Sequence, residues 1–128
     1  MKFRIIVAAL GLTAGLLELS TASYAQDVEL GSKVFKKCMA CHAIDEKNKI
    51  GPSLKGIVGR KAATVEGFKY SDAMLAKGAE GVVWDEATLA AYLPDPKAFV
   101  PGTKMAFPGL KKPEEVTDLI AFLKANGT

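Results

Sequence analysis

The sequence predicts a small all-α domain of four or five short helices joined by long loops. Four segments begin at residues that favour helix N-termini and continue with apolar residues at helical spacing. Between them, residues 42–70 contain many glycines and lysines without a sustained period, and residues 94–112 are also irregular. Loops of this length are uncommon in a compact domain. We therefore expect a large, flat, apolar cofactor to serve as the core that the loops wrap.

The first and last predicted helices carry the clearest signals. Asp27 suits the N-cap of a helix over 28–38. Pro113 suits the first position of the last helix, and Gly127 follows its final turn. The last helix has a broad apolar face, formed by Val116, Leu119, Ile120, Phe122 and Leu123.

Two shorter helices are predicted between these. Ser71 can cap a helix over 72–77, and Asp85 can cap another over 86–93. Pro94 ends the second, because proline lacks the N–H that a continuing helix would use.

The N-terminal segment predicts export. A basic start, an uncharged apolar run over 5–17 and the small-residue pattern Ser23-Tyr24-Ala25 follow one another, as in a secretory signal peptide. We expect cleavage after Ala25, so that 1–25 is the signal peptide and 26–128 is a single domain in the periplasm. An uncleaved membrane anchor is the alternative, although the apolar run is shorter than the ~20 residues of a spanning helix.

The charge of the chain argues against nucleic-acid binding. Removing Lys2, Arg4 and Glu18 with the signal peptide lowers the net charge from +3 to +2. Arg60 is then the one arginine left, so no arginine-rich stripe exists. A modest positive charge is compatible with docking to an acidic protein surface.

The motif Cys38-Met39-Ala40-Cys41-His42 predicts covalent attachment of a c-type haem. Two thiols three positions apart on a helical turn can each bond one vinyl group of the haem, and the next residue can place its imidazole under the iron. A redox-active or structural cysteine pair is one alternative, but the motif closes a helix and lacks the strand–turn–helix context. Zinc would need more thiolates or imidazoles than two cysteines and one histidine.

His42 would bind the iron through one ring nitrogen and donate a hydrogen bond from the other. A backbone carbonyl near Gly51-Pro52 is the candidate acceptor. The second axial ligand is sought among Met39, Met74 and Met105, since the chain has one histidine.

Met105 is the favoured second ligand. Met39 lies within the attachment turn and cannot reach the opposite face, and Met74 lies in a predicted helix, where core packing is the ordinary role. Met105 lies in the loop 100–109, which prolines and glycines hold in shape. His/Met ligation is a known electron-transfer pairing.

Several segments then carry a resemblance to a known family: 38–42, 51–56, 58–60, 100–107, and Trp84 followed by Tyr92-Leu93. On these motifs the chain resembles the class I cytochromes c, both mitochondrial and soluble bacterial. The resemblance implies a small all-α fold around one haem c bound through Cys38 and Cys41. It also implies that the first and last helices cross, with Gly31 and Phe35 against Leu119 and Phe122.

The resemblance further implies roles for residues around the haem. His42 and Met105 are the axial ligands, and Pro52 supplies the carbonyl behind His42. A haem propionate accepts hydrogen bonds from Arg60, Tyr70 and Trp84. Tyr92 and Thr103 lie near the Met105 sulfur, and Phe107 covers the haem edge. One departure is Met74, where the family commonly has an asparagine in a polar network, so that network is expected to differ here.

Six lysines flank the attachment turn and the Met105 loop: Lys36, Lys37, Lys97, Lys104, Lys111 and Lys112. If both segments meet around the haem edge, these lysines form a docking surface for acidic partners. The alternative is scattered, solvated surface charge.

These observations predict a soluble, monomeric one-electron carrier and not an enzyme. The resemblance implies a cytochrome bc complex as donor and an oxidase, a peroxidase or a photosynthetic reaction centre as acceptor. Two rivals remain open at this point. One is an enzyme or sensor in which Met105 leaves the iron open, and the other is a membrane-tethered carrier. A redox-active thiol protein is a more distant third.

We predict that the exported protein begins at Gln26. Intact mass and N-terminal sequencing of the protein purified from the periplasm would show this. Retention of residues 5–17 in the purified protein would instead support the tethered carrier.

Overall fold

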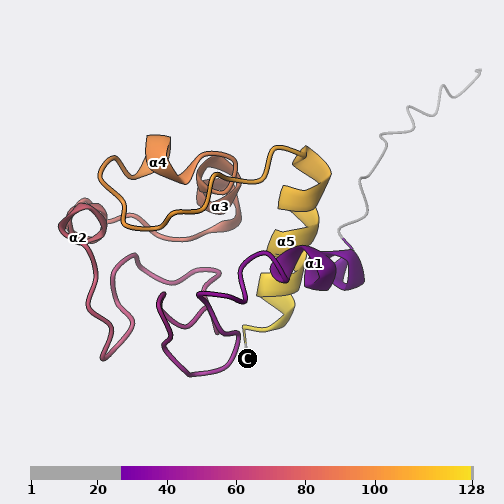
Figure 1. The fold of residues 1–128 in the computed structure, drawn as a ribbon, viewed down its shortest axis with the longest axis horizontal. Coiled ribbons are helices and arrows are strands. Elements are labelled where there is room, and N and C mark those ends of the chain that lie inside the picture. The colour runs from indigo at the N-terminus through magenta and orange to yellow at the C-terminus, as the bar shows by residue number, and fades with distance from the viewer. Residues whose placement is uncertain (1–26, 128) are drawn as a thin grey trace, which may run out of the picture.

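The computed structural model describes residues 27–127 and contains five helices and no strand within that range (Figure 1). The helices are α1 (Val28–Phe35), α2 (Asp72–Ala79), α3 (Glu86–Tyr92), α4 (Pro96–Phe99) and α5 (Pro113–Ala125). The predicted all-α class is confirmed. The predicted signal peptide lies outside the described residues. Within 27–127, no helix is both long and apolar enough to cross a membrane.

The predicted N-caps are confirmed. The side chains of Asp27, Ser71 and Asp85 each accept a hydrogen bond from the backbone N–H three residues ahead, at 2.9, 3.2 and 2.7 Å. Each cap satisfies a donor that the first helical turn leaves free. The first helix is shorter than predicted, since α1 ends at Phe35 and the chain continues through tight turns to Cys41.

Helix α4 lies in a stretch that the sequence predicted to be irregular. The Asp95 side chain accepts from the Ala98 N–H at 3.1 Å, and Pro96 takes the first helical position. Both are ordinary start signals. The helix spans only four residues, so it shows no apolar period that would have identified it.

Helices α1 and α5 cross in close contact, as predicted. A Cβ atom at Gly31 would lie 2.0 Å from the Asp118 carbonyl oxygen, so the two backbones touch where no side chain fits. The rings of Phe35 and Phe122 pack with their centroids 5.1 Å apart, and Leu119 is only 1% exposed. Figure 1 shows α1 passing across α5 at this point.

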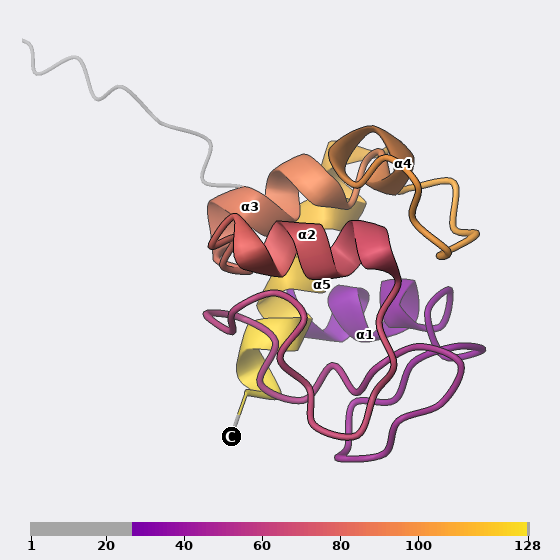
Figure 2. The same ribbon diagram turned by 90° about the vertical axis from the view of Figure 1, so that its left-hand side faces the viewer.

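The loop over 36–70 lies on one side of the molecule, opposite α2, α3 and α4, and α5 runs beside both (Figures 1 and 2). The Gly51 N–H donates to the Cys41 carbonyl at 2.8 Å, which folds the loop back onto the attachment turn. The two sides are joined by backbone hydrogen bonds between 59–62 and 82–84, beside an isolated bridge. The Trp84 N–H donates to the Arg60 carbonyl, and the Trp84 carbonyl accepts from the Gly59 N–H. These contacts bring loop segments far apart in sequence around one central region.

We predict that Gly31→Ala lowers the free energy of unfolding by about 2 to 3 kcal/mol, because the added methyl group overpacks the α1–α5 crossing. Urea unfolding of the haem-loaded protein would measure this. Lys33→Ala is the matched control, since Lys33 is on the same helix but exposed. Equal stability of the two variants would contradict the role given to the crossing.

Candidate functional site

The attachment motif forms a tight turn at the end of α1. The N–H groups of Cys41 and His42 both donate to the Cys38 carbonyl, at 3.1 and 2.9 Å. Both cysteines are half-buried and form no disulfide. Burial raises the pKa of the Cys38 thiol. Within 27–127, no group of three or more His, Cys, Asp or Glu side chains is placed to hold a metal ion, so the zinc alternative lacks a ligand set.

The His42 ring is held by the turn that carries Pro52. Its Nδ1 lies 2.8 Å from the Pro52 carbonyl oxygen, the hydrogen bond that the sequence predicted. A carbonyl can only accept, so Nδ1 carries the proton and the lone pair of Nε2 is left for a ligand bond. Burial lowers the pKa of His42, which favours the neutral, ligating form.

Sequence reasoning did not identify the tight contact between His42 and Gly51. A Cβ atom at Gly51 would lie 2.4 Å from Cε1 of the ring. Glycine is therefore required here for the backbone to approach the imidazole. The Gly51-Pro52 pair is visible in the sequence, but it predicted only a carbonyl that accepts a hydrogen bond from His42.

Met105 lies half-buried in the loop between α4 and α5. The Tyr92 hydroxyl donates to its Sδ atom at 3.5 Å, and the Thr103 hydroxyl accepts from its backbone N–H at 3.2 Å. Burial raises the pKa of Tyr92 to about 12, so the hydroxyl keeps its proton at neutral pH. The structure thus places the Tyr92 hydroxyl at the Met105 sulfur, whereas Thr103 contacts the Met105 backbone.

Tyr92, which contacts Met105, belongs to a cluster of three aromatic rings. The Trp84 centroid lies 4.8 Å from Tyr92 and 6.0 Å from Phe99, and Tyr92 and Phe99 are 5.7 Å apart. Trp84 is only 6% exposed, and Phe107 packs half-buried against the same core. Apolar rings on this side match the flat, apolar cofactor expected from the sequence.

Two of the three predicted propionate donors, Arg60 and Tyr70, have side-chain hydrogen-bond partners within the chain. Arg60 donates from both terminal nitrogens, to the carbonyls of Ser53 and Lys55 at 2.9 and 3.0 Å. The Tyr70 hydroxyl accepts from the Val65 N–H at 2.9 Å and keeps its own hydrogen free to donate. Burial lowers the pKa of Arg60, and the neighbouring Tyr70 opposes that shift. Their contact with a propionate stays a prediction.

The other two methionines lie where the sequence predicted. Met39 is 51% exposed on the attachment turn, and Met74 packs half-buried against the hydrophobic core from α2.

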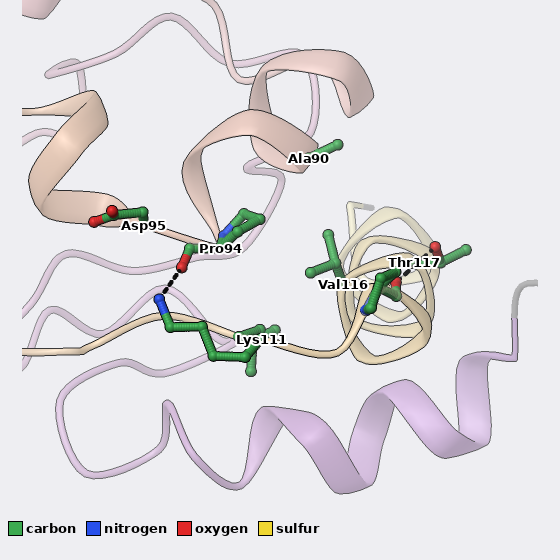
Figure 3. Close-up of a pocket in the computed structure, with 8 residues that line it drawn as sticks. Ala90, Pro94, Asp95, Lys111, Val116 and Thr117 are labelled. Atoms are coloured by element: carbon green, nitrogen blue, oxygen red, sulfur yellow. Dashed lines mark hydrogen bonds between the residues drawn. The ribbon is translucent and has the colours of Figure 1, made fainter.

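The six predicted docking lysines are all exposed, but they are not equivalent. Lys37 forms an ion pair with Glu115 of α5 at 2.8 Å. Lys111 donates to the Pro94 carbonyl at 2.6 Å, beside a groove between α3 and α5 (Figure 3). The side-chain amines of the other four form no hydrogen bond or ion pair with the described residues: Lys36, Lys97, Lys104 and Lys112. The groove itself contains neither cysteine, nor His42, nor Met105.

The donor set fits a covalently bound haem. One turn supplies two free thiols and an imidazole whose Nδ1 already donates a hydrogen bond to the Pro52 carbonyl. Met105 of the loop between α4 and α5 and Cys38 of the attachment turn both pack against the same hydrophobic core. The protein-family model described as cytochrome c matches residues 28–126.

The chain belongs to the cytochrome c family. It is 52% identical over 103 residues to cytochrome c-550 of Ancylobacter novellus, covering 77% of this chain and 96% of that protein. It is 49% identical to cytochrome c2 of Rhodoplanes tepidamans, covering 80% of this chain and 94% of that protein. The solved structure of cytochrome cH from Methylobacterium extorquens superposes with a TM-score of 0.72 at 49% identity, covering 77% of this chain and 98% of that one.

Family membership confirms the class I fold, covalent haem c as cofactor and electron transfer as the general activity. The two cysteines of the motif, Cys38 and Cys41, are the attachment points. The relatives are electron carriers and not enzymes, which removes the support for an open-iron enzyme.

We predict that Tyr92 makes stability fall with alkaline pH. Its pKa is about 12 in the folded protein against an ordinary 10.0. Below pH 10 both states keep the proton, and between pH 10 and 12 the unfolded chain loses it first, which costs about 2 to 3 kcal/mol of stability. Urea unfolding from pH 9 to 12 should show this loss, and Tyr92→Phe should lack it. Parallel pH profiles for the two proteins would contradict the assignment.

Proposed function

We propose that this cytochrome c is an exported periplasmic carrier that moves single electrons between membrane redox complexes, with His42 and Met105 as axial ligands of the haem iron. The observation that carries the proposal is the His42 ring. Its Nδ1 is hydrogen-bonded to the Pro52 carbonyl at 2.8 Å, so Nε2 is the nitrogen available to a metal.

Met105 is the proposed second ligand. When bound, the haem supplies an iron that cycles between the ferric and ferrous states. The Tyr92 hydroxyl, which stays protonated, orients the Met105 thioether from behind. A soft sulfur ligand favours the ferrous state and raises the potential. With His42 and Met105 both bound to it, the iron would have no coordination position left for a substrate.

Export rests on the N-terminal pattern described above, with residues 1–25 removed and 26–128 retained. The resemblance to a bacterial cytochrome c2 supports a periplasmic location. A cytochrome bc complex is the proposed donor, and an oxidase, a peroxidase or a photosynthetic reaction centre is the proposed acceptor.

The docking surface proposed for these partners consists chiefly of Lys36, Lys97, Lys104 and Lys112. These exposed amines have no acceptor among the described residues and are free to meet carboxylates. Lys37 and Lys111 contribute less, because each is engaged within the chain. Steering by such charges depends on salt concentration.

We predict that Met105→Ala leaves the haem attached but lowers the reduction potential sharply and removes the weak sulfur-to-iron band of the ferric spectrum. Met74→Ala is the matched control, since it removes a thioether that packs in the core, and should retain that band. The measurements are a redox titration, the ferric absorption spectrum of the native protein for the band, and the spectrum after denaturation for attached haem.

His42→Ala is expected to block maturation or leave badly ligated haem. Two results would overturn the ligand assignment: an unchanged potential in Met105→Ala, or normal holoprotein from His42→Ala. Haem lost from the denatured wild-type protein would contradict covalent attachment itself.

A further inference from the structure

The guanidinium of Arg60 donates two hydrogen bonds to a single turn of the backbone. Its Nη2 donates to the Ser53 carbonyl at 2.9 Å, and its Nη1 donates to the Lys55 carbonyl at 3.0 Å. The planar fork of arginine matches two acceptors at fixed spacing, which a single ammonium does not. The side chain is half-buried, so these bonds are partly shielded from water.

That turn begins at Pro52, the acceptor for His42. The Ser53 carbonyl is one peptide unit beyond the Pro52 carbonyl, which lies 2.8 Å from His42 Nδ1. A displacement of the turn would therefore move the acceptor away from the imidazole. Two other hydrogen bonds on the turn come from the loop that follows the motif: the Ser53 N–H donates to the Asn48 side chain at 3.0 Å, and the Leu54 N–H donates to the Ala43 carbonyl at 2.9 Å.

Arg60 connects this turn to the opposite side of the molecule. Its own carbonyl accepts from the Trp84 N–H at 2.9 Å, and the Gly59 N–H donates to the Trp84 carbonyl at 2.9 Å. Trp84 is buried against Tyr92, which contacts Met105. Arg60 thus links the turn behind the proposed first ligand to the core behind the proposed second ligand.

We infer that Arg60 is a positioning residue for His42, acting through the turn 52–55. This inference rests on the proposed function, in which His42 binds the iron. By holding the Pro52 carbonyl in place, Arg60 keeps the proton on Nδ1, fixes the ring orientation and leaves Nε2 basic. The role differs from the propionate contact that the resemblance implies, since it requires the fork of Arg60 and not only its charge.

The test is the rate at which the His42 Nδ1 proton exchanges with deuterium in the reduced holoprotein, followed by NMR. Arg60→Lys keeps the charge but cannot span both carbonyls, and we expect exchange to accelerate roughly tenfold. Arg60→Gln, measured alongside, is expected to shift the rate in the same direction. The amide of Leu119 in α5 reports global unfolding and should exchange at the wild-type rate.

Lys61→Ala is the matched control, because it removes an exposed charge next to Arg60 in the chain while leaving the fork intact. It should not change exchange at His42. Wild-type exchange in both Arg60 variants would overturn the inference. Equal acceleration at His42 and Leu119 would also overturn it, since that indicates general destabilisation. Failure of the proposed function is separate, because it would appear as normal holoprotein from His42→Ala or as an unchanged potential in Met105→Ala.

Discussion

The close approach of α1 and α5 at Gly31 is the contact on which the rest of the structure depends. The attachment turn follows α1 directly, so the place where α1 lies on α5 determines where the two thiols and His42 lie. The Asp27 N–H donates to the Asp118 carboxylate at 3.1 Å at one end of α1, and Lys37 pairs with Glu115 near the other. The motif is therefore presented from a fixed support and not from a mobile loop.

The loop after the motif is held mainly by polar contacts. Between residues 42 and 70 the buried side chains are few, namely Ser53, Ile57 and Ala62. Backbone and side-chain hydrogen bonds replace the missing apolar core, and among the described residues no buried side-chain nitrogen or oxygen lacks a partner. A covalently held, apolar cofactor explains how such loops can be both long and ordered, because it provides the apolar surface that they cover.

The number of lysines on a surface does not by itself describe the charge that a docking partner encounters. Lys36 and Lys37 are neighbours in sequence, yet Lys37 is paired with Glu115 while Lys36 extends freely. The electrostatic field around the protein depends on which lysine amines are already paired with carboxylates of the same chain. That difference depends on a contact between residues 78 positions apart.

The sequence by itself determined the features that depend on nearby residues. The N-caps at Asp27, Ser71 and Asp85 involve bonds across three positions, and the attachment motif is confined to one turn. Helix α4 was missed because four residues cannot show a period. Only the tertiary structure decided that Arg60 bonds the turn behind His42, because its acceptors lie five and seven positions away in an irregular loop where no helical or strand period places them. Contacts of that kind depend on distances across space, which neither spacing nor propensity along the chain encodes.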